Sequence, residues 1–295
     1  MAARGEPPEL TEGAQRHGMQ AEALAGFAAL SEGALGVDAG LTLTKVARAT
    51  AGGLELSSQA TGGGETVATG ATVTGLTGAR ADGAGLVAGA VRSQEIEAAA
   101  QGALALLLHA GRAPVGDFVL ALLGTGTAFA TVRIGAEGMK VGHLGGTPLG
   151  GGSFAGIARR IDASLTHEMM MAGAARGDRR AVDVMISEAY PEGIGRVGPD
   201  LTAAHLAAPR EGTLDDVLAG LLNLHGENIA QIGASRALIA QIPRIVMAGG
   251  FAHNNPALTQ SIASMCRLFG VTVDVAPSPG YAGAVGAALI AAEAA

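Results

Sequence analysis

The chain has 295 residues, of which 48% are hydrophobic and 15% charged, so its composition excludes a disordered protein. Its formal net charge of −7 excludes a general nucleic-acid binder, which needs a basic face. The single cysteine, Cys266, excludes a disulfide framework, and no uncharged run is a convincing membrane span. We therefore expect a soluble, cytoplasmic protein, with Cys266 buried in an apolar helix.

The first half of the chain begins with a weak pattern and then becomes strand-like. Residues 1–33 have only weak helical character, and we interpret them as a disordered N-terminal tail. From Leu35, glycine turns separate three strand-like segments, LGVD, KVARAT and LELSS. Residues 62–71 are too rich in glycine for a firm helix, and VTGLTG after them is typical of a short buried strand. Apolar residues at helical spacing in SQEIEAAAQGALALLLHAG then predict a helix that stops at Gly111.

The second half shows a clearer alternation of strands and helices. Two strands flank the turn at 124–127, and PRIVMAGG is a further buried strand that ends in paired glycines. Asn255 and Pro256 are typical of a helix start, and Gly270 ends that helix. A strand, VTVDVAP, and a helix of small residues over 283–295 follow. This alternation predicts an α/β protein.

Two predicted hairpins resemble each other. LGVDAGLTLTKVAR and ALLGTGTAFATVR share an apolar strand, a glycine turn, a threonine and a second strand that ends in arginine. The similarity indicates an internal duplication, in which two lobes each present a tight turn to a shared cleft. A match this short is also compatible with chance.

The first hairpin carries residues suited to phosphate chemistry. Gly40 leaves backbone N–H groups accessible to an anion, while Thr42 and Lys45 add a hydroxyl and a mobile positive charge. Asp38 could hold Mg²⁺, which prefers few carboxylates together with substrate oxygens. The alternative is an ordinary hairpin in which Lys45 is solvated.

A third glycine cluster, Gly150–Gly152, leads directly into a predicted helix. Open N–H groups at a helix start form a site for a phosphate or a nucleotide. The spacing is neither that of a Walker loop nor that of a dinucleotide fingerprint. A fourth pair, Gly249 and Gly250, ends a buried strand, where ligands of α/β sheets commonly bind.

Candidates for acid–base chemistry are Glu95 and Glu97, at the start of a helix. Residues two apart do not share a helix face, so at most one of them points into a cleft. A kinase for an alcohol needs such a carboxylate to accept the hydroxyl proton. Both acids could instead complement the helix dipole. For His225 and Glu227, which could form a pair, a structural role is favoured.

Eight segments in order resemble the motifs of the type II pantothenate kinases, a branch of the actin-like, sugar-kinase-like ATPase superfamily. They are DAGLTLTK, QEIEAAAQG, LLGTGTA, GGTPLGGGSFAGI, GDRRAVDV, GPDLTAAHLA, AGGFAHNNPAL and PGYAGAVGAAL. The resemblance implies an α/β, two-lobed actin-like ATPase fold, with duplicated ribonuclease-H-like lobes at 34–112 and 113–295 and an interlobe cleft. It also implies a cytoplasmic homodimer that phosphorylates pantothenate to 4'-phosphopantothenate, with ATP and Mg²⁺ as cofactors and coenzyme A or acyl-coenzyme A as a feedback ligand.

The resemblance assigns roles to individual positions. Glu95 would be the general base that deprotonates the pantothenate hydroxyl, and Asp38 would be the metal ligand. The ATP-binding positions would be Asp38, Ala39, Gly40, Leu41, Thr42, Lys45, Thr125, Gly126, Thr127, Gly151, Gly152, Ser153, Phe154, Ala155, His167 and Phe251. The positions near pantothenate would be His143, Gly145 and Thr202.

Three departures from the family pattern keep other functions open. His143 replaces an arginine that contacts the substrate in the family, and the candidates to compensate for it are Lys140 and Arg159. Leu41 replaces a second glycine in the first motif, and the glycine-rich residues 62–71 replace a helix. The alternatives are a homologue that binds nucleotide or coenzyme A without catalysis, and a kinase for another alcohol such as an amino sugar.

Overall fold

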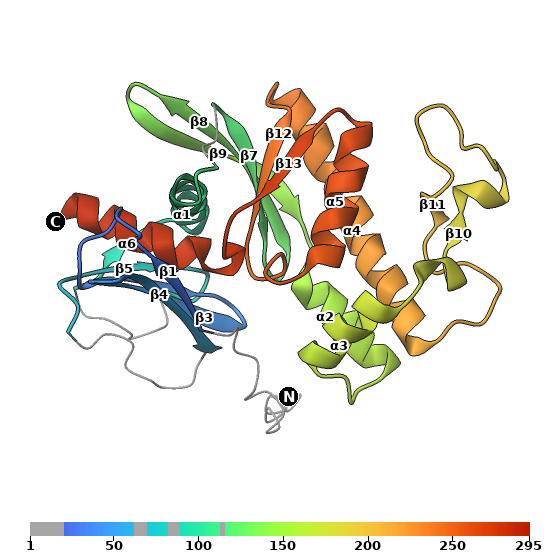
Figure 1. Ribbon diagram of the computed structural model, residues 1–295, viewed down its shortest axis with the longest axis horizontal. Helices are drawn as coiled ribbons and strands as arrows, with labels where there is room; N and C mark the ends of the chain where they lie inside the picture. Colours follow the sequence, from blue (N-terminus) through green and yellow to red (C-terminus); the bar gives the residue numbers. More distant parts are fainter. Residues whose placement is uncertain (1–20, 62–69, 82–88, 113–115) are drawn as a thin grey trace, which may run out of the picture.

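The computed structural model describes residues 21–61, 70–81, 89–112 and 116–295, which form two main sheets (Figure 1). The first sheet has the spatial order β1-β4-β3-β2-β5-β6. Its strands are β1 (Glu22–Ala25), β2 (Ala34–Ala39), β3 (Leu43–Thr50), β4 (Gly53–Ala60), β5 (Val73–Thr77) and β6 (Val91–Arg92). The second sheet has the order β13-β12-β7-β8-β9. Its strands are β7 (Phe118–Leu123), β8 (Thr127–Gly135), β9 (Gly138–Thr147), β12 (Arg244–Ala248) and β13 (Thr272–Val275).

The two sheets share one topology, which confirms the predicted duplication. In each, a three-stranded antiparallel meander is followed by two parallel strands: β4-β3-β2-β5-β6 in the first sheet and β9-β8-β7-β12-β13 in the second. The matched hairpins of the sequence are β2–β3 and β7–β8. Strand β1 has no counterpart among the described strands of the second sheet.

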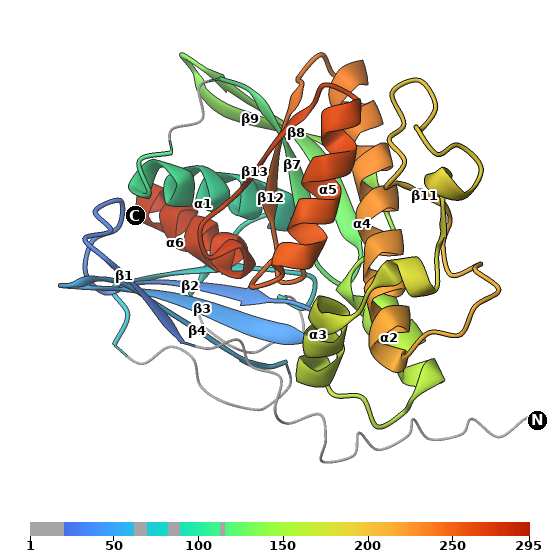
Figure 2. The same cartoon turned by 45° about the vertical axis from the view of Figure 1, so that its right-hand side comes forward.

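Helices fill the space between the sheets and cover the far face of the second sheet (Figures 1 and 2). Their bounds are α1 (Glu95–His109), α2 (Gly151–Ile161), α3 (His167–Arg176), α4 (Leu214–Ile239), α5 (Pro256–Leu268) and α6 (Ala282–Ala294). One core joins α1 and α6 to residues of both sheets, and the other joins the second sheet to α2–α5. Cys266 is buried in the latter core, as predicted, and burial raises the pKa of its thiol to about 12.

Glycine allows α1 and α6 to approach each other very closely. A Cβ atom at Gly286 would collide with the carbonyl oxygen of Ala98, and one at Gly102 with that of Ala282. Helix α6 also lies against β2 and β5, where Gly36 faces its backbone in the same way. The residue at each of these contacts must be small because backbone meets backbone there.

Two predictions about organisation differ from the structure. The prediction of a disordered tail over residues 1–33 is wrong for the described residues 21–33, because β1 pairs with β4 and the side chains of Phe27 and Leu30 are buried. Helix α6 lies within the predicted C-terminal lobe, 113–295, but packs on the first sheet. The sequence also predicts that the glycine-rich residues 62–71 replace a helix of the family pattern. Of these, residues 62–69 lie outside the described residues.

An excursion between α3 and α4 carries two short strands, β10 (Val184–Met185) and β11 (Thr202–Ala204). Three short 3-10 helices complete the described elements: η2 (Arg179–Ala181), η3 (Ile186–Glu188) and η4 (Pro279–Tyr281). In both views the excursion lies beside α4, on the side away from the first sheet (Figures 1 and 2). It therefore adds to the second half of the molecule only.

Candidate active site

The first predicted phosphate turn joins β2 to β3 and brings Asp38 beside Lys45. The two residues are cross-strand partners, and Lys45 Nζ lies 3.0 Å from Asp38 Oδ2. The other carboxylate oxygen, Asp38 Oδ1, is buried and has no hydrogen-bond partner among the described residues. Because a buried carboxylate oxygen without a partner is costly, Oδ1 is suited to bind a cation or its hydrating water.

Backbone atoms of two other segments lie close to the Asp38 carboxylate, one beside each oxygen. A Cβ atom at Gly78, after β5, would lie 2.6 Å from Oδ1, and one at Gly283, in the first turn of α6, would lie 2.9 Å from Oδ2. Gly78 has a φ of +100°, which also favours glycine. The carboxylate thus lies at the positive end of α6, where a negative charge is stabilised.

Glu95 is the first residue of α1 and interacts electrostatically with the Asp38–Lys45 pair. Loss of solvent around its carboxyl group raises the pKa of Glu95, the negative charge of Asp38 raises it further, and Lys45 lowers it. The residue as a whole remains exposed, so this carboxyl group belongs to a surface that solvent can still reach. Its position supports Glu95 over Glu97 as the candidate base, which stays a prediction.

The second predicted phosphate turn, Gly124–Gly126, packs against the start of α2. The N–H of Gly151 donates to the Gly124 carbonyl at 2.9 Å, and that of Gly152 donates to the Thr125 carbonyl at 2.9 Å. These two donors are therefore already used, which corrects the expectation of open N–H groups at this helix start. The reason is close packing, since a Cβ atom at Gly150 would lie 2.6 Å from the Thr125 carbonyl oxygen.

Two residues predicted to bind ATP, Thr127 and Ser153, have side chains that hold this glycine loop in place. The Thr127 hydroxyl donates to the Leu149 carbonyl at 2.8 Å. Ser153 Oγ lies 2.8 Å from His225 Nε2, and His225 Nδ1 lies 2.8 Å from the Leu221 carbonyl oxygen. Burial lowers the pKa of His225, so the neutral ring donates from Nδ1 and accepts the Ser153 proton at Nε2.

The aromatic rings of Phe154 and Phe251 belong to the core. Their centroids lie 5.8 Å apart, and each ring also contacts His225. Both residues are at most 5% exposed. Contacts to a nucleotide at these positions would therefore involve the backbone rather than the rings.

Other predicted ligands lie on the surface, namely Leu41, Thr42, Thr125, His143 and His167. Ala39 is buried, and Gly40, Gly126, Gly145 and Ala155 are partly buried. Lys140, one candidate to replace the missing arginine, pairs with Glu137 at 2.7 Å. An arginine not foreseen from the sequence, Arg236, lies beside Gly145, with its guanidinium carbon 5.2 Å from the Phe129 ring centroid.

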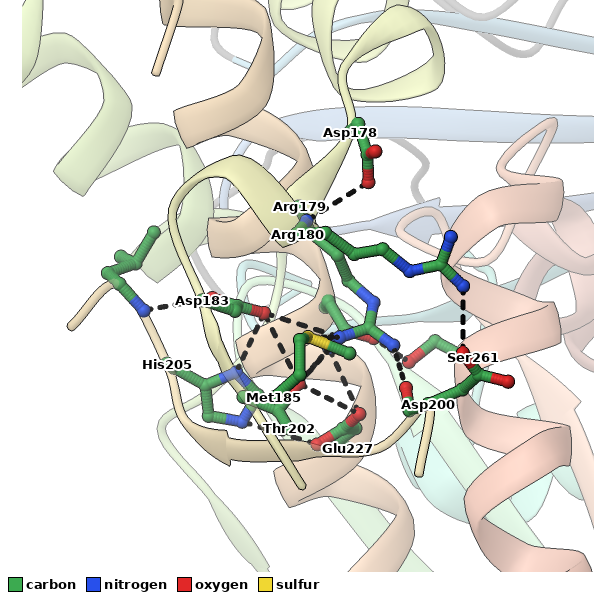
Figure 3. Close-up of polar contacts among 12 residues, drawn as sticks. Asp178, Arg179, Arg180, Asp183, Met185, Asp200, Thr202, His205, Glu227 and Ser261 are labelled. Atoms are coloured by element: carbon green, nitrogen blue, oxygen red, sulfur yellow. Dashed lines mark hydrogen bonds and ion pairs between the residues drawn. The ribbon is translucent and has the colours of Figure 1, made fainter. Parts of the chain in front are cut away.

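The third candidate region, around Thr202, is a buried polar cluster that joins the excursion to α4 (Figure 3). Asp183 and Glu227 are 0% and 4% exposed, and His205 lies between them, 3.7 Å from Asp183 Oδ2 and 3.4 Å from Glu227 Oε2. Burial tends to raise the pKa of Asp183, but the adjacent His205 ring, the hydrogen bond from the Leu206 N–H and the charge of Arg179 bring the pKa below its usual value. The carboxylate is therefore stabilised in its ionised form.

Thr202 is the centre of this cluster, and its hydroxyl group is fully engaged. It accepts from Arg179 Nη1 at 2.8 Å and from Asn223 Nδ2 at 3.1 Å, and lies 3.2 Å from Asp183 Oδ2 as a donor (Figure 3). A hydroxyl group donates once and accepts twice. A bond from this hydroxyl to pantothenate would therefore require one of these contacts to be exchanged.

Sequence reasoning missed most of the cluster. GDRRAVDV and GPDLTAAHLA signalled the region as motifs, but did not show that Asp183, His205 and Glu227 meet. The suggested pairing of His225 with Glu227 is wrong, because His225 bonds Ser153 and Leu221, while Glu227 accepts from Asn223 at 3.0 Å. Residues two apart on a helix point to different faces.

The described residues contain neither a cluster suited to a metal ion nor a helix suited to span a membrane. Within the described ranges, no three His, Cys, Asp or Glu side chains gather as a metal centre would require. None of the described helices combines the length and hydrophobicity that a membrane span requires.

Comparison with known proteins extends the resemblance seen in the motifs. Residues 112–290, more than half of the chain, match the family model described as Fumble. The chain belongs to the Fumble family. Its relatives include the type II pantothenate kinase of Oceanobacillus iheyensis, which is 27% identical over 198 residues, or 66% of this chain and 72% of that protein.

The Fumble-family chain has the two-lobed fold of actin-like ATPases. The activator of the 2-hydroxyisocaproyl-CoA dehydratase from Clostridium difficile, solved with bound ADPNP, has a TM-score of 0.55 and 17% identity, with 88% of this chain and 94% of that chain covered. Glucokinase from Balamuthia mandrillaris, solved with glucose, has a TM-score of 0.51 and 13% identity, with 87% and 92% covered. The predicted fold is thereby confirmed.

Proposed function

We propose that this chain is an ATP-dependent pantothenate kinase. The primary hydroxyl oxygen of pantothenate attacks the γ-phosphorus of ATP, the bond from that phosphorus to the bridging oxygen breaks, and 4'-phosphopantothenate and ADP form. The observation that carries the proposal is the interaction of Glu95 with the Asp38–Lys45 pair, in a chain of the Fumble family. The electrostatic interaction supports a role for the Glu95 carboxyl group together with the hairpin that resembles a phosphate motif.

In this mechanism, Glu95 accepts the proton of the pantothenate hydroxyl as the phosphoryl group is transferred. The raised pKa of Glu95 suits this role, because a general base is most effective when its pKa lies near the working pH. Lys45 exchanges its contact with Asp38 for a phosphate oxygen and compensates for negative charge there.

Mg²⁺ is the cofactor that this reaction class requires, and the residues present fit it. Asp38 offers a buried carboxylate oxygen, Oδ1, with no hydrogen-bond partner among the described residues. A single protein carboxylate is sufficient, because Mg²⁺ retains waters and binds substrate phosphates. When bound, the ion neutralises charge on the phosphates. Asp38 itself would hold the ion.

The decisive experiment compares Glu95→Gln with Glu97→Gln in an assay that couples ADP release to NADH oxidation. We expect Glu95→Gln to lower kcat with pantothenate by about 10²–10⁴-fold, because general-base catalysis contributes that much. ATP affinity, measured by calorimetry, should be retained. Glu97→Gln is the matched control and should keep its turnover. Equal turnover in Glu95→Gln and the wild type would overturn the assignment.

A panel of acceptors separates the alternatives. The same assay is run with pantothenate, pantetheine and N-acetylglucosamine. We expect turnover with pantothenate, despite His143 in place of the arginine. ATP binding without turnover on any of the three would favour a homologue that binds nucleotide or coenzyme A but no longer catalyses. Turnover on the amino sugar alone would favour a kinase for another alcohol.

We further propose a cytoplasmic homodimer that coenzyme A or an acyl-coenzyme A inhibits by feedback. The resemblance to type II pantothenate kinases supports both features, and a single, buried Cys266 suits a reducing compartment. Light scattering of the purified protein tests the dimer, and titration of coenzyme A into the kinase assay tests inhibition.

A further inference from the structure

Strand β1 is an addition to the duplicated topology, and it reaches the other half of the molecule. It lies at the edge of the first sheet, before the region that matches the family model, residues 112–290. Its first residue, Glu22, contacts two loops that belong to the second half of the chain. Figure 2 shows β1 on the first sheet, with α6 and the loops of β12 and β13 above it.

The contacts of Glu22 are short and largely shielded. Glu22 Oε1 lies 2.9 Å from His253 Nε2, and the His253 side chain is 4% exposed. Ser278 Oγ donates to the other oxygen, Glu22 Oε2. The ring of Tyr281 stands edge-on to that of His253, with centroids 5.6 Å apart and an interplanar angle of 88°. Tyr281 hydrogen-bonds Ser58 of β4, which joins the same loop to the first sheet.

The protonation of His253 fits this arrangement. Burial lowers the pKa of His253, while the charge and hydrogen bond of Glu22 oppose the shift. The ring is therefore neutral, and it donates its Nε2 proton to Glu22. Burial raises the pKa of Tyr281, the other titratable group that faces His253, so it also stays neutral. Glu22 thus accepts two hydrogen bonds, one from His253 and one from Ser278.

His253 is part of the turn that follows β12, which other bonds connect to the predicted site. The N–H of Phe251 donates to the carbonyl of Leu123, at the end of β7, at 2.9 Å. The N–H of Gly249 donates to the carbonyl of Pro279 at 2.7 Å. The chain then enters α6, whose Gly283 lies against Asp38. The second predicted phosphate turn therefore adjoins this turn directly, and the first is connected to it through Pro279 and the start of α6.

We propose that Glu22 is a positioning residue for the nucleotide site, because it fixes the 249–253 turn through His253 and the approach to α6 through Ser278. The inference rests on the proposed function only in taking ATP as the ligand. Glu22 contacts no reacting atom; it sets the position of backbone that ATP contacts. Nucleotide affinity then depends on a strand that lies outside the matched region.

The test compares Glu22→Ala with Glu32→Ala, since Glu32 is an exposed acid of the same segment. We expect Glu22→Ala to weaken ATP binding in calorimetry by about tenfold, or about 1.4 kcal/mol, because the backbone that ATP contacts is then less well fixed. The KM for ATP should rise likewise, while the KM for pantothenate at saturating ATP stays unchanged. Glu32→Ala should match the wild type.

A double-mutant cycle shows whether Glu22 acts through His253. Glu22→Ala should have a smaller effect in a His253→Ala background, where only its contact with Ser278 remains, and Glu22→Gln, which keeps one acceptor oxygen, should be intermediate. Equal ATP affinity in Glu22→Ala and Glu32→Ala would overturn the proposal, as would additive effects in the cycle. If Glu22→Ala does not fold, Glu22→Gln decides by the same criteria. Binding measurements need no acceptor, so failure to phosphorylate pantothenate would refute only the proposed function.

Discussion

At the scale of single residues, the arrangement around Asp38 separates two similar glutamates. Glu95 and Glu97 lie two positions apart at the start of α1, and Glu95 interacts with Asp38 and Lys45. Loss of solvent around the carboxyl group contributes most to the raised pKa of Glu95. The negative charge of Asp38 raises that pKa further, and Lys45 offsets part of the rise.

This coupling predicts a shifted acid limb in the pH profile. A protonated Glu95 cannot accept the substrate proton, so kcat/KM falls as pH decreases through its pKa. Because that pKa is raised above the ordinary 4.5, the fall should begin at a higher pH than for an ordinary glutamate. The measurement is kcat/KM against pH for the wild type. Glu97→Gln should keep the same limb, and a limb near 4.5 would contradict the interpretation.

At the scale of elements, the close approach of α1 and α6 depends on glycine. Changing Gly286 to alanine would place a methyl group onto the carbonyl of Ala98. We expect this variant to lose about 1–3 kcal/mol of unfolding free energy, as overpacked cores do. Gly135→Ala is the control, since a Cβ atom there meets nothing within 4 Å. Thermal denaturation compares them, and equal melting temperatures would show that the helices can separate at little cost.

At the scale of the whole molecule, the two halves share one core. Residues of both sheets, such as Leu54 and Leu120, belong to the same buried cluster as α1 and α6. We therefore expect one cooperative transition in differential scanning calorimetry, with a calorimetric enthalpy equal to the van't Hoff enthalpy. Two resolved transitions would mean that the halves unfold separately.

Local patterns were sufficient to predict much of this fold. Glycine turns between apolar strands reveal the β2–β3 and β7–β8 hairpins, and the Asn255 cap reveals α5, because these signals involve neighbouring residues. Strand β1 escaped prediction because EALA lacks the alternation and β-branched residues of a strand, and its pairing with β4 depends on the rest of the sheet. The position of α6 on the first sheet is a non-local property in the same sense.

The candidate site likewise contains some features that local patterns predict and others that depend on distant segments. The hairpin that carries Asp38 and Lys45 could be predicted from the sequence, and the structure shows that the two residues are cross-strand neighbours in it. The cluster around Thr202 could not, since Asp183, His205 and Glu227 come from separate segments that meet only after folding. The expectation of open N–H groups at Gly151 and Gly152 was wrong for a related reason. Their partners lie in the Gly124–Gly126 turn, which no local pattern connects to the helix.

The return of α6 to the first sheet has a consequence for biosynthesis. Residues 282–294 cover β2 and β5, which the ribosome makes more than 200 residues earlier. The apolar face of the first sheet that α6 covers therefore stays exposed while the second half of the chain is translated. Such a delay favours binding by chaperones, and this fold is complete only after α6 has left the ribosome.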